Sequence, residues 1–180
     1  MTYYGAKDIA AAFRLVRSNT IQIANEIPED QYGFKPSKES RSVGQTLVHI
    51  ALGPGFQHHI QSSKINDLKL VNFPDLMQKV RTEEAKPRDK AETIAFLKAE
   101  GDKFASFVES LSDSFLAEQV AMPPGATPAT KSRFEMLLSP KEHEMHHRGQ
   151  LMTMQRMIGQ VPHLTRQMNE RMAQMAAAKK

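Results

Sequence analysis

Apolar residues recur at intervals of three and four along most of this chain, and proline or glycine separates one such stretch from the next. That spacing lines apolar side chains along one face of an α-helix. No stretch shows sustained alternation of β-branched residues, so strands are not expected. The pattern predicts four long helices and a short C-terminal helix, over residues 6–26, 42–63, 90–112, 132–158 and 162–175.

Four long helices that each carry one apolar stripe are typical of a helical bundle. The predicted fold is therefore all-α, with a four-helix bundle over residues 1–160 and a short extra C-terminal helix and tail over residues 161–180. A chain of 180 residues is long enough to form one domain with a substantial core.

The second helix has a clear start and an internal interruption. Ser42 and Gln45 have the spacing of a capping box, in which the serine and the glutamine satisfy free amide donors of the first turn. Pro54 lies inside the same helix and is expected to kink or break it, because proline has no amide hydrogen. Residues 64–87 are mixed in character, with a turn expected at residues 73–75 and a short helix over residues 76–85. The Pro- and Gly-rich residues 122–130 are expected to form a loop.

The last long helix has two candidate starts. Ser132 with Glu135, and Ser139 with Glu142, both have capping-box spacing. Pro140 stands where proline is favoured at the first position of a helix. The helix is therefore expected either to kink at Pro140 or to begin at Ser139.

Composition excludes several classes of protein. There is no cysteine, which excludes disulfide bonds, a cysteine nucleophile and thiolate metal ligands. No apolar run is long enough to cross a membrane and no secretory signal is visible, so a cytoplasmic protein is expected. The net charge is +4, but lysine and arginine are dispersed among acidic residues rather than clustered, and nucleic acid is not an expected partner.

Three of the seven histidines are predicted to face the core. His143 and His147 are four residues apart, which places them about 40° from each other on one helix face. The same face continues through apolar residues of that helix. His49 lies on the inward stripe of the second helix. His58 and His59 fall on other faces, and His146 is expected at the flank of the group.

Buried imidazoles are unfavourable unless each has a partner. One metal ion would satisfy His49, His143 and His147 together, and three protein ligands with one open position are typical of a catalytic metal site. The alternative is that the rings hydrogen-bond to one another, to Gln150 or to water. Gln150 has the helical phase to support the site from outside.

Two segments resemble the DinB/YfiT-like family. EHEMHHRGQL, residues 142–151, is similar to the family signature H-x-x-H-H-R-G-Q, and RSVGQTLVHIA, residues 41–51, is similar to its other marker. The resemblance implies a four-helix bundle, often a homodimer, with zinc or nickel bound by three histidines. Carried over position by position, these ligands are His49, His143 and His147.

The resemblance also implies a substrate class, because characterised members act with low-molecular-weight thiols. The first hypothesis is therefore a metal-dependent thiol S-transferase acting on a small molecule. The second is a metal-dependent hydrolase, although helical phase points Glu142 and Glu144 away from the site and leaves no evident general base. The third is a non-enzymatic metal-binding or stress-linked protein. No catalytic residue or thiol-binding residue is assigned.

Overall fold

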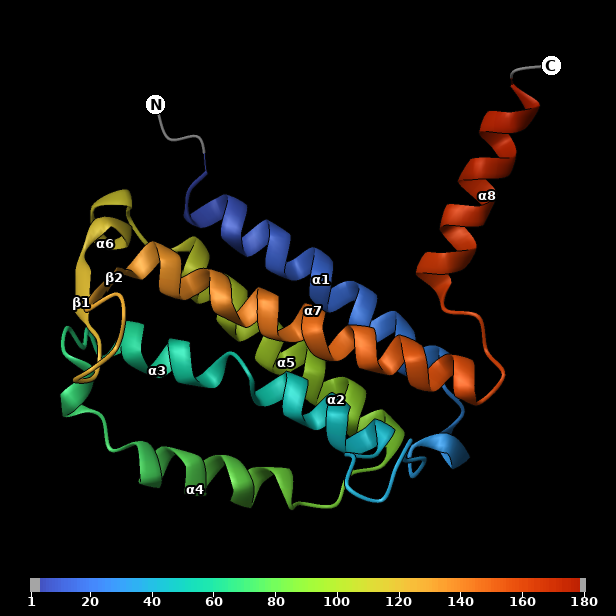
Figure 1. Cartoon of the computed structure of the whole chain (residues 1–180), viewed down its shortest axis with the longest axis horizontal. Coiled ribbons are helices and arrows are strands. Elements are labelled where there is room, and N and C mark those ends of the chain that lie inside the picture. The colour runs from blue at the N-terminus through green and yellow to red at the C-terminus, as the bar shows by residue number, and fades with distance from the viewer. Residues whose placement is uncertain (1–3, 179–180) are drawn as a thin grey trace.

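The computed structural model describes residues 4–178 and forms a four-helix bundle (Figure 1). Its long elements are α1 (Ala6–Glu26), α2 (Val43–Leu52), α5 (Lys90–Glu109) and α7 (Arg133–Met157). Both α1 and α2 pack against α5 and α7, so α1 and α2 occupy opposite corners of the bundle. A shorter helix, α3 (Gly55–Ser62), continues the course of α2 (Figure 1).

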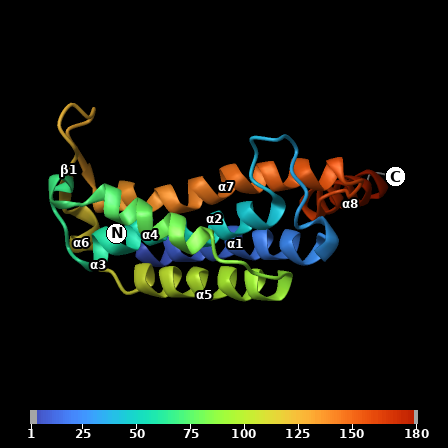
Figure 2. The same cartoon turned by 90° about the horizontal axis from the view of Figure 1, so that it is seen from below.

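The remaining elements connect or flank the bundle. Helix α4 (Phe73–Glu84) lies outside the bundle and contacts α2. Helix α8 (His163–Ala177) follows Gly159 and projects away from the bundle, as Figure 1 shows. The loop before α2 stands over the bundle near α2 and α7 (Figure 2). The shorter elements are η1 (Glu29–Gln31), η2 (Leu68–Leu70), α6 (Asp113–Ala117), β1 (Gln119–Ala121) and β2 (Thr130–Ser132).

The core runs along the bundle axis because each long helix turns its apolar stripe inward. At the end that holds α2, Ile23, Leu47 and Leu151 are fully buried in one cluster. At the opposite end, Phe13 and Phe104 meet edge to face with ring centroids 5.0 Å apart. These contacts confirm the predicted all-α bundle, and the extra C-terminal helix is also present.

Three features differ from the prediction. Strands β1 and β2 pair antiparallel on either side of the predicted loop, but each has three residues, which is too short for an alternation to be visible in the sequence. Residues 110–112 are not part of α5, and the chain turns there into the short helix α6. Helix α4 begins at Phe73, earlier than expected, because the Asn72 side chain caps it by accepting from the amide of Asp75.

The two prolines inside helices have different outcomes. Pro54 separates α2 from α3, as expected. Helix α7 instead begins at Arg133 and continues through Pro140. Proline removes the donor for the carbonyl four residues before it, and here the Ser139 hydroxyl donates to that carbonyl, on Met136, at 2.9 Å. Ser139 therefore bridges the interruption in α7 rather than starting the helix.

Candidate metal centre

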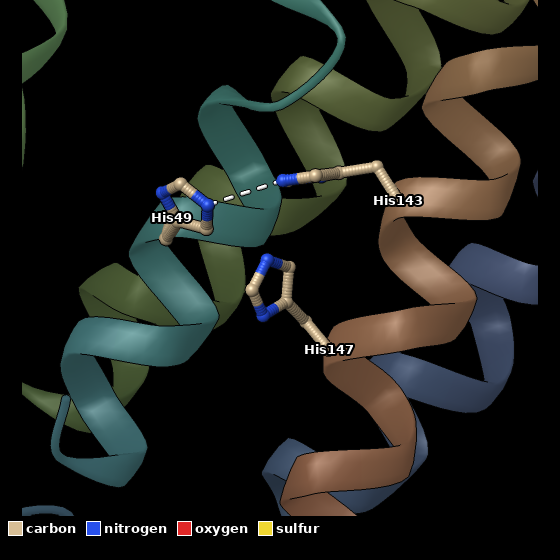
Figure 3. Close-up of side chains that lie close together, drawn as sticks. All are labelled: His49, His143 and His147. Carbon is tan, nitrogen blue, oxygen red and sulfur yellow. Dashed lines mark hydrogen bonds between the residues drawn. The ribbon is translucent and has the colours of Figure 1, made fainter. Parts of the chain in front are cut away.

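The three predicted histidines come together between α2 and α7. His49 lies on α2, and His143 and His147 lie one turn apart on α7 (Figure 3). One ring nitrogen from each lies within 4.8 Å of the others. The Nε2 atoms of His49 and His143 are 3.1 Å apart. The structure thus brings together the three side chains selected by helical phase.

The absence of a side chain at Gly53 allows the His143 ring to pack directly against the backbone of α2. A Cβ atom at this position would lie 2.7 Å from Nδ1 and 3.0 Å from Cε1 of the His143 ring. Side chains do not tolerate such distances without moving. The glycine therefore provides the space that the imidazole occupies, directly before the proline that ends α2.

The outer ring nitrogens of two of these histidines have partners. His49 Nδ1 lies 2.6 Å from Oε1 of Glu84 on α4, and His147 Nδ1 lies 2.8 Å from Oε1 of Gln150. Carboxylate and amide oxygens only accept hydrogen bonds, so these Nδ1 atoms donate. The proton is then held on Nδ1, and Nε2 is left with a lone pair. In Figure 3 the Nε2 side of His147 faces the other two rings.

This arrangement suits a cation. Two imidazole lone pairs 3.1 Å apart repel one another unless a proton or a metal ion lies between them. The pKa of His143 is lowered to about 4, first by burial and then by the neighbouring His147 and His49. Burial also lowers the pKa of His147. The His143 and His147 rings are therefore neutral near pH 7, which is the form that binds a metal.

A groove of about 710 Å³ opens beside His147. Its lining includes His147, Gln150 and the buried Thr46, and the loop before α2 forms its rim. The exposed Arg41 stands on this rim, with Nη2 3.9 Å from Glu84. The other lining residues are Pro36, Glu39, Ser40, Thr153 and Met154. One member of the cluster, His147, therefore borders a space large enough for a small molecule.

The remaining histidines of interest lie outside the cluster. His146 is exposed, and its ring centroid is 4.9 Å from that of His147. His58 packs against Phe107 on α5, and His59 is exposed. These positions agree with their predicted faces.

The glutamates next to His143 also lie off the site. Glu142 is exposed, and Glu144 is buried against Arg17 on α1. The residue missed by sequence analysis is Glu84. It lies in the mixed segment before α5, and its position beside His49 depends on how α4 folds back along α2.

Comparison with known proteins places the chain in a family. The DinB family matches residues 3–178, which is nearly the whole chain and includes α8. The chain belongs to the DinB family. No curated protein matches it. The division of the chain near residue 160 stays a prediction.

Solved structures with low sequence identity share the fold. A DinB-like protein from Bacillus subtilis matches with a TM-score of 0.62 and 19% identity, over 85% of this chain and 93% of that one. YfiT from Bacillus subtilis, described as a probable metal-dependent hydrolase with an unusual four-helix bundle topology, matches with a TM-score of 0.67 and 12% identity, over 89% of this chain and 91% of that one. A protein from Streptococcus pneumoniae matches with a TM-score of 0.59 and 13% identity, over 86% of this chain and 93% of that one.

Across residues 4–178, no helix is both long and apolar enough to cross a lipid bilayer.

Proposed function

We propose that this chain binds one divalent metal ion through His49, His143 and His147 and acts as a transferase with a low-molecular-weight thiol. The observation that carries the metal site is the convergence of three ring nitrogens on one point between α2 and α7. Two of the rings are held from behind by Glu84 and Gln150. Partners of this kind orient metal-binding imidazoles and increase their basicity.

The donor set limits the choice of ion. Three imidazole nitrogens suit zinc and nickel. Three protein ligands leave a coordination position for a small molecule, as in catalytic rather than structural zinc sites. A divalent ion with such a position supplies thiol activation, because it lowers the pKa of a bound thiol so that the nucleophilic thiolate forms near pH 7.

The groove supports a small-molecule substrate. The chain contains no cysteine, so the thiol must come from a separate molecule. The groove leads from solvent to His147 between Arg41 on the rim and Met154 on α7. Arg41 can pair with a carboxylate of a small thiol, and Met154 offers apolar contact. A homodimer and a cytoplasmic location stay predictions.

A metal-dependent hydrolase is the second candidate, and the resemblance of the fold to YfiT favours it. The position of the carboxylates argues against it. Glu84 is engaged with His49, and Glu144 is engaged with Arg17. Glu39 is the acidic residue on the groove wall, and it is exposed on the loop rather than held at the histidines.

Metal content is the first test. The protein purified without a histidine tag is expected to carry, or to take up, about one zinc or nickel ion per chain. A His49→Ala, His143→Ala, His147→Ala variant is expected to carry none. A parent protein that cannot be loaded with either ion would contradict the metal site.

Activity then separates the candidate functions. Turnover of an electrophile that requires added thiol, and that is lost in His143→Ala, supports the transferase. Turnover of esters, amides or phosphates without thiol supports the hydrolase instead. A protein that binds metal and shows neither activity fits the non-enzymatic alternative.

A further inference from the structure

A buried arginine joins all four helices of the bundle beside the histidine cluster. Arg17 on α1 is 4% exposed. Its Nε donates to both carboxylate oxygens of Glu144 on α7 at 3.0 Å. Its Nη1 donates to the carbonyl of Leu97 on α5 at 2.6 Å, and its Nη2 to the carbonyl of Ile50 on α2 at 3.1 Å. One guanidinium group therefore contacts α2, α5 and α7 from α1.

The contact with Ile50 compensates for the proline that ends α2. In a continuous helix, the carbonyl of Ile50 would accept from the amide of residue 54. That residue is Pro54, which has no amide hydrogen. The amide of Gly53 lies 3.3 Å from the same carbonyl oxygen, but it also donates to the backbone carbonyl of His49 at 3.0 Å. Arg17 supplies the donor that the backbone lacks at this point.

The contact with α5 requires a glycine. A Cβ atom at position 101 would lie 2.9 Å from Cγ and 3.0 Å from Nη1 of Arg17. Gly101 is buried in the middle of α5, where glycine is otherwise an unfavourable helix residue. The glycine leaves the space through which the arginine side chain passes.

Two of the residues that Arg17 contacts, Ile50 and Glu144, are sequence neighbours of proposed metal ligands. Ile50 follows His49 on α2, and Glu144 follows His143 on α7. Arg17 binds the two helices at these positions at once. The separation of α2 and α7 at this level determines how far His49 Nε2 lies from His143 Nε2.

We propose that Arg17, with Glu144, is a positioning pair that sets the spacing of α2 and α7 and thereby the geometry of the three histidines. This inference rests on the proposed metal site. A buried ion pair is weak evidence for stability, because the removal of two charges from water offsets most of their attraction. Its four-helix connection beside the histidines is instead consistent with a role in holding one geometry.

Arg133 offers a matched control. It is 1% exposed and donates to Glu118 at 2.9 Å, to Gln61 at 2.8 Å and to the carbonyl of Ile65 at 3.0 Å. It lies at the start of α7, ten residues before His143. At 1.5 Å per residue this is about 15 Å along the helix. Replacement of either arginine disrupts a buried hydrogen-bond network, but only the Arg17 network includes neighbours of the histidines in the sequence.

The test compares Arg17→Lys with Arg133→Lys. Lysine keeps the positive charge, but its single nitrogen cannot serve Glu144, Leu97 and Ile50 together. In crystal structures of the metal-free proteins, the distance between His49 Nε2 and His143 Nε2 is expected to increase in Arg17→Lys and to stay as in the parent in Arg133→Lys. Affinity for Zn²⁺, measured by competition with a chelator, is expected to fall about 10- to 100-fold in Arg17→Lys alone. The visible spectrum of bound Co²⁺ should change in the same variant.

Rescue by the backbone is the sharpest control. Pro54→Ala restores an amide donor for the carbonyl of Ile50. In the Arg17→Lys background it is expected to recover part of the Zn²⁺ affinity, and in the Arg133→Lys background to change nothing. If Arg17→Lys does not fold, Glu144→Gln gives the same comparison, because it keeps the shape of the side chain and removes its charge.

The outcomes separate this inference from the proposed function. An unchanged distance between the two Nε2 atoms in metal-free Arg17→Lys, or equal losses of affinity in the Arg17 and Arg133 variants, would overturn the positioning role. A parent protein that binds no metal would overturn the proposed function, and the metal-free distances would still decide whether Arg17 positions the rings.

Discussion

Glu84 Oε1 lies 2.6 Å from His49 Nδ1, so a carboxylate from a helix outside the bundle holds the outer side of a ring whose inner nitrogen faces the cluster. The contact joins residues 35 positions apart in the sequence. It fixes the tautomer of His49 and directs Nε2 toward His143. The proposed metal site thus draws on α2, α4 and α7, and not on the two histidine-bearing helices alone.

The first prediction follows from this contact. Glu84→Gln is expected to lower zinc affinity about 10- to 100-fold, because the amide is uncharged and holds the imidazolium-like, metal-bound ring less strongly. Chelator competition measures the effect. Glu109→Gln is the control, since Glu109 forms an exposed ion pair with Arg14. Equal affinity in the Glu84→Gln variant and the parent would show that the carboxylate does not support the site.

The second prediction concerns Gly53. Gly53→Ala places a Cβ atom 2.7 Å from His143 Nδ1, so the ring must move away from His49. Metal binding is expected to fall by at least the 10-fold seen when supporting residues of metal sites are removed. Gly55→Ala is the matched control, because a Cβ atom there meets nothing within 4 Å. Calorimetric titration with zinc distinguishes them, and equal affinity in the two variants would contradict the steric role.

The third prediction tests how α7 passes Pro140. Ser139→Ala removes the hydroxyl that donates to the carbonyl of Met136. A hydrogen bond of this kind contributes about 1 kcal/mol, so the melting temperature should fall by about 2–4 °C for a chain of this size. Ser18→Ala is the control, because its hydroxyl contacts a carbonyl in the unbroken helix α1. Equal melting temperatures for Ser139→Ala and the parent would show that the bond is not needed.

Much of the fold could be predicted from sequence because local signals and long-range packing agree. The apolar stripe of α1 predicts its burial, and the helix has the predicted bounds of Ala6–Glu26. The capping box of Ser42 and Gln45 forms as its spacing predicts. The strands and α6 were not predictable, since three to five residues are too few to show a period.

In the candidate site too, the residues with a local sequence signal were predicted, and those that depend on tertiary packing were not. His143 and His147 were found because helical phase places both on one face, and His49 because its helix has a clear inward stripe. Glu84 and Arg17 were missed because their roles depend on which helices become neighbours. No spacing in the sequence relates Arg17 to Glu144, 127 residues away.

The last prediction is a pH dependence of the metal-free protein. The pKa of His143 is lowered to about 4 in the folded state, first by burial and then by His147 and His49, and an exposed histidine has a pKa near 6.5. The unfolded chain therefore binds more protons between these values. Folding stability from this residue is fully present above about pH 6.5 and is lost as the pH falls toward 4.

Urea unfolding at pH 7.5 and pH 5 measures this loss. His143→Gln should be less sensitive to acid than the parent by on the order of 1 kcal/mol, a modest value because His143 is only half-buried and water screens its charge. His59→Gln, on the exposed side of α3, is the control and should keep the parent's dependence. If His143→Gln and the parent lost the same free energy of unfolding between pH 7.5 and pH 5, the lowered pKa of His143 would not contribute to the acid sensitivity of the fold.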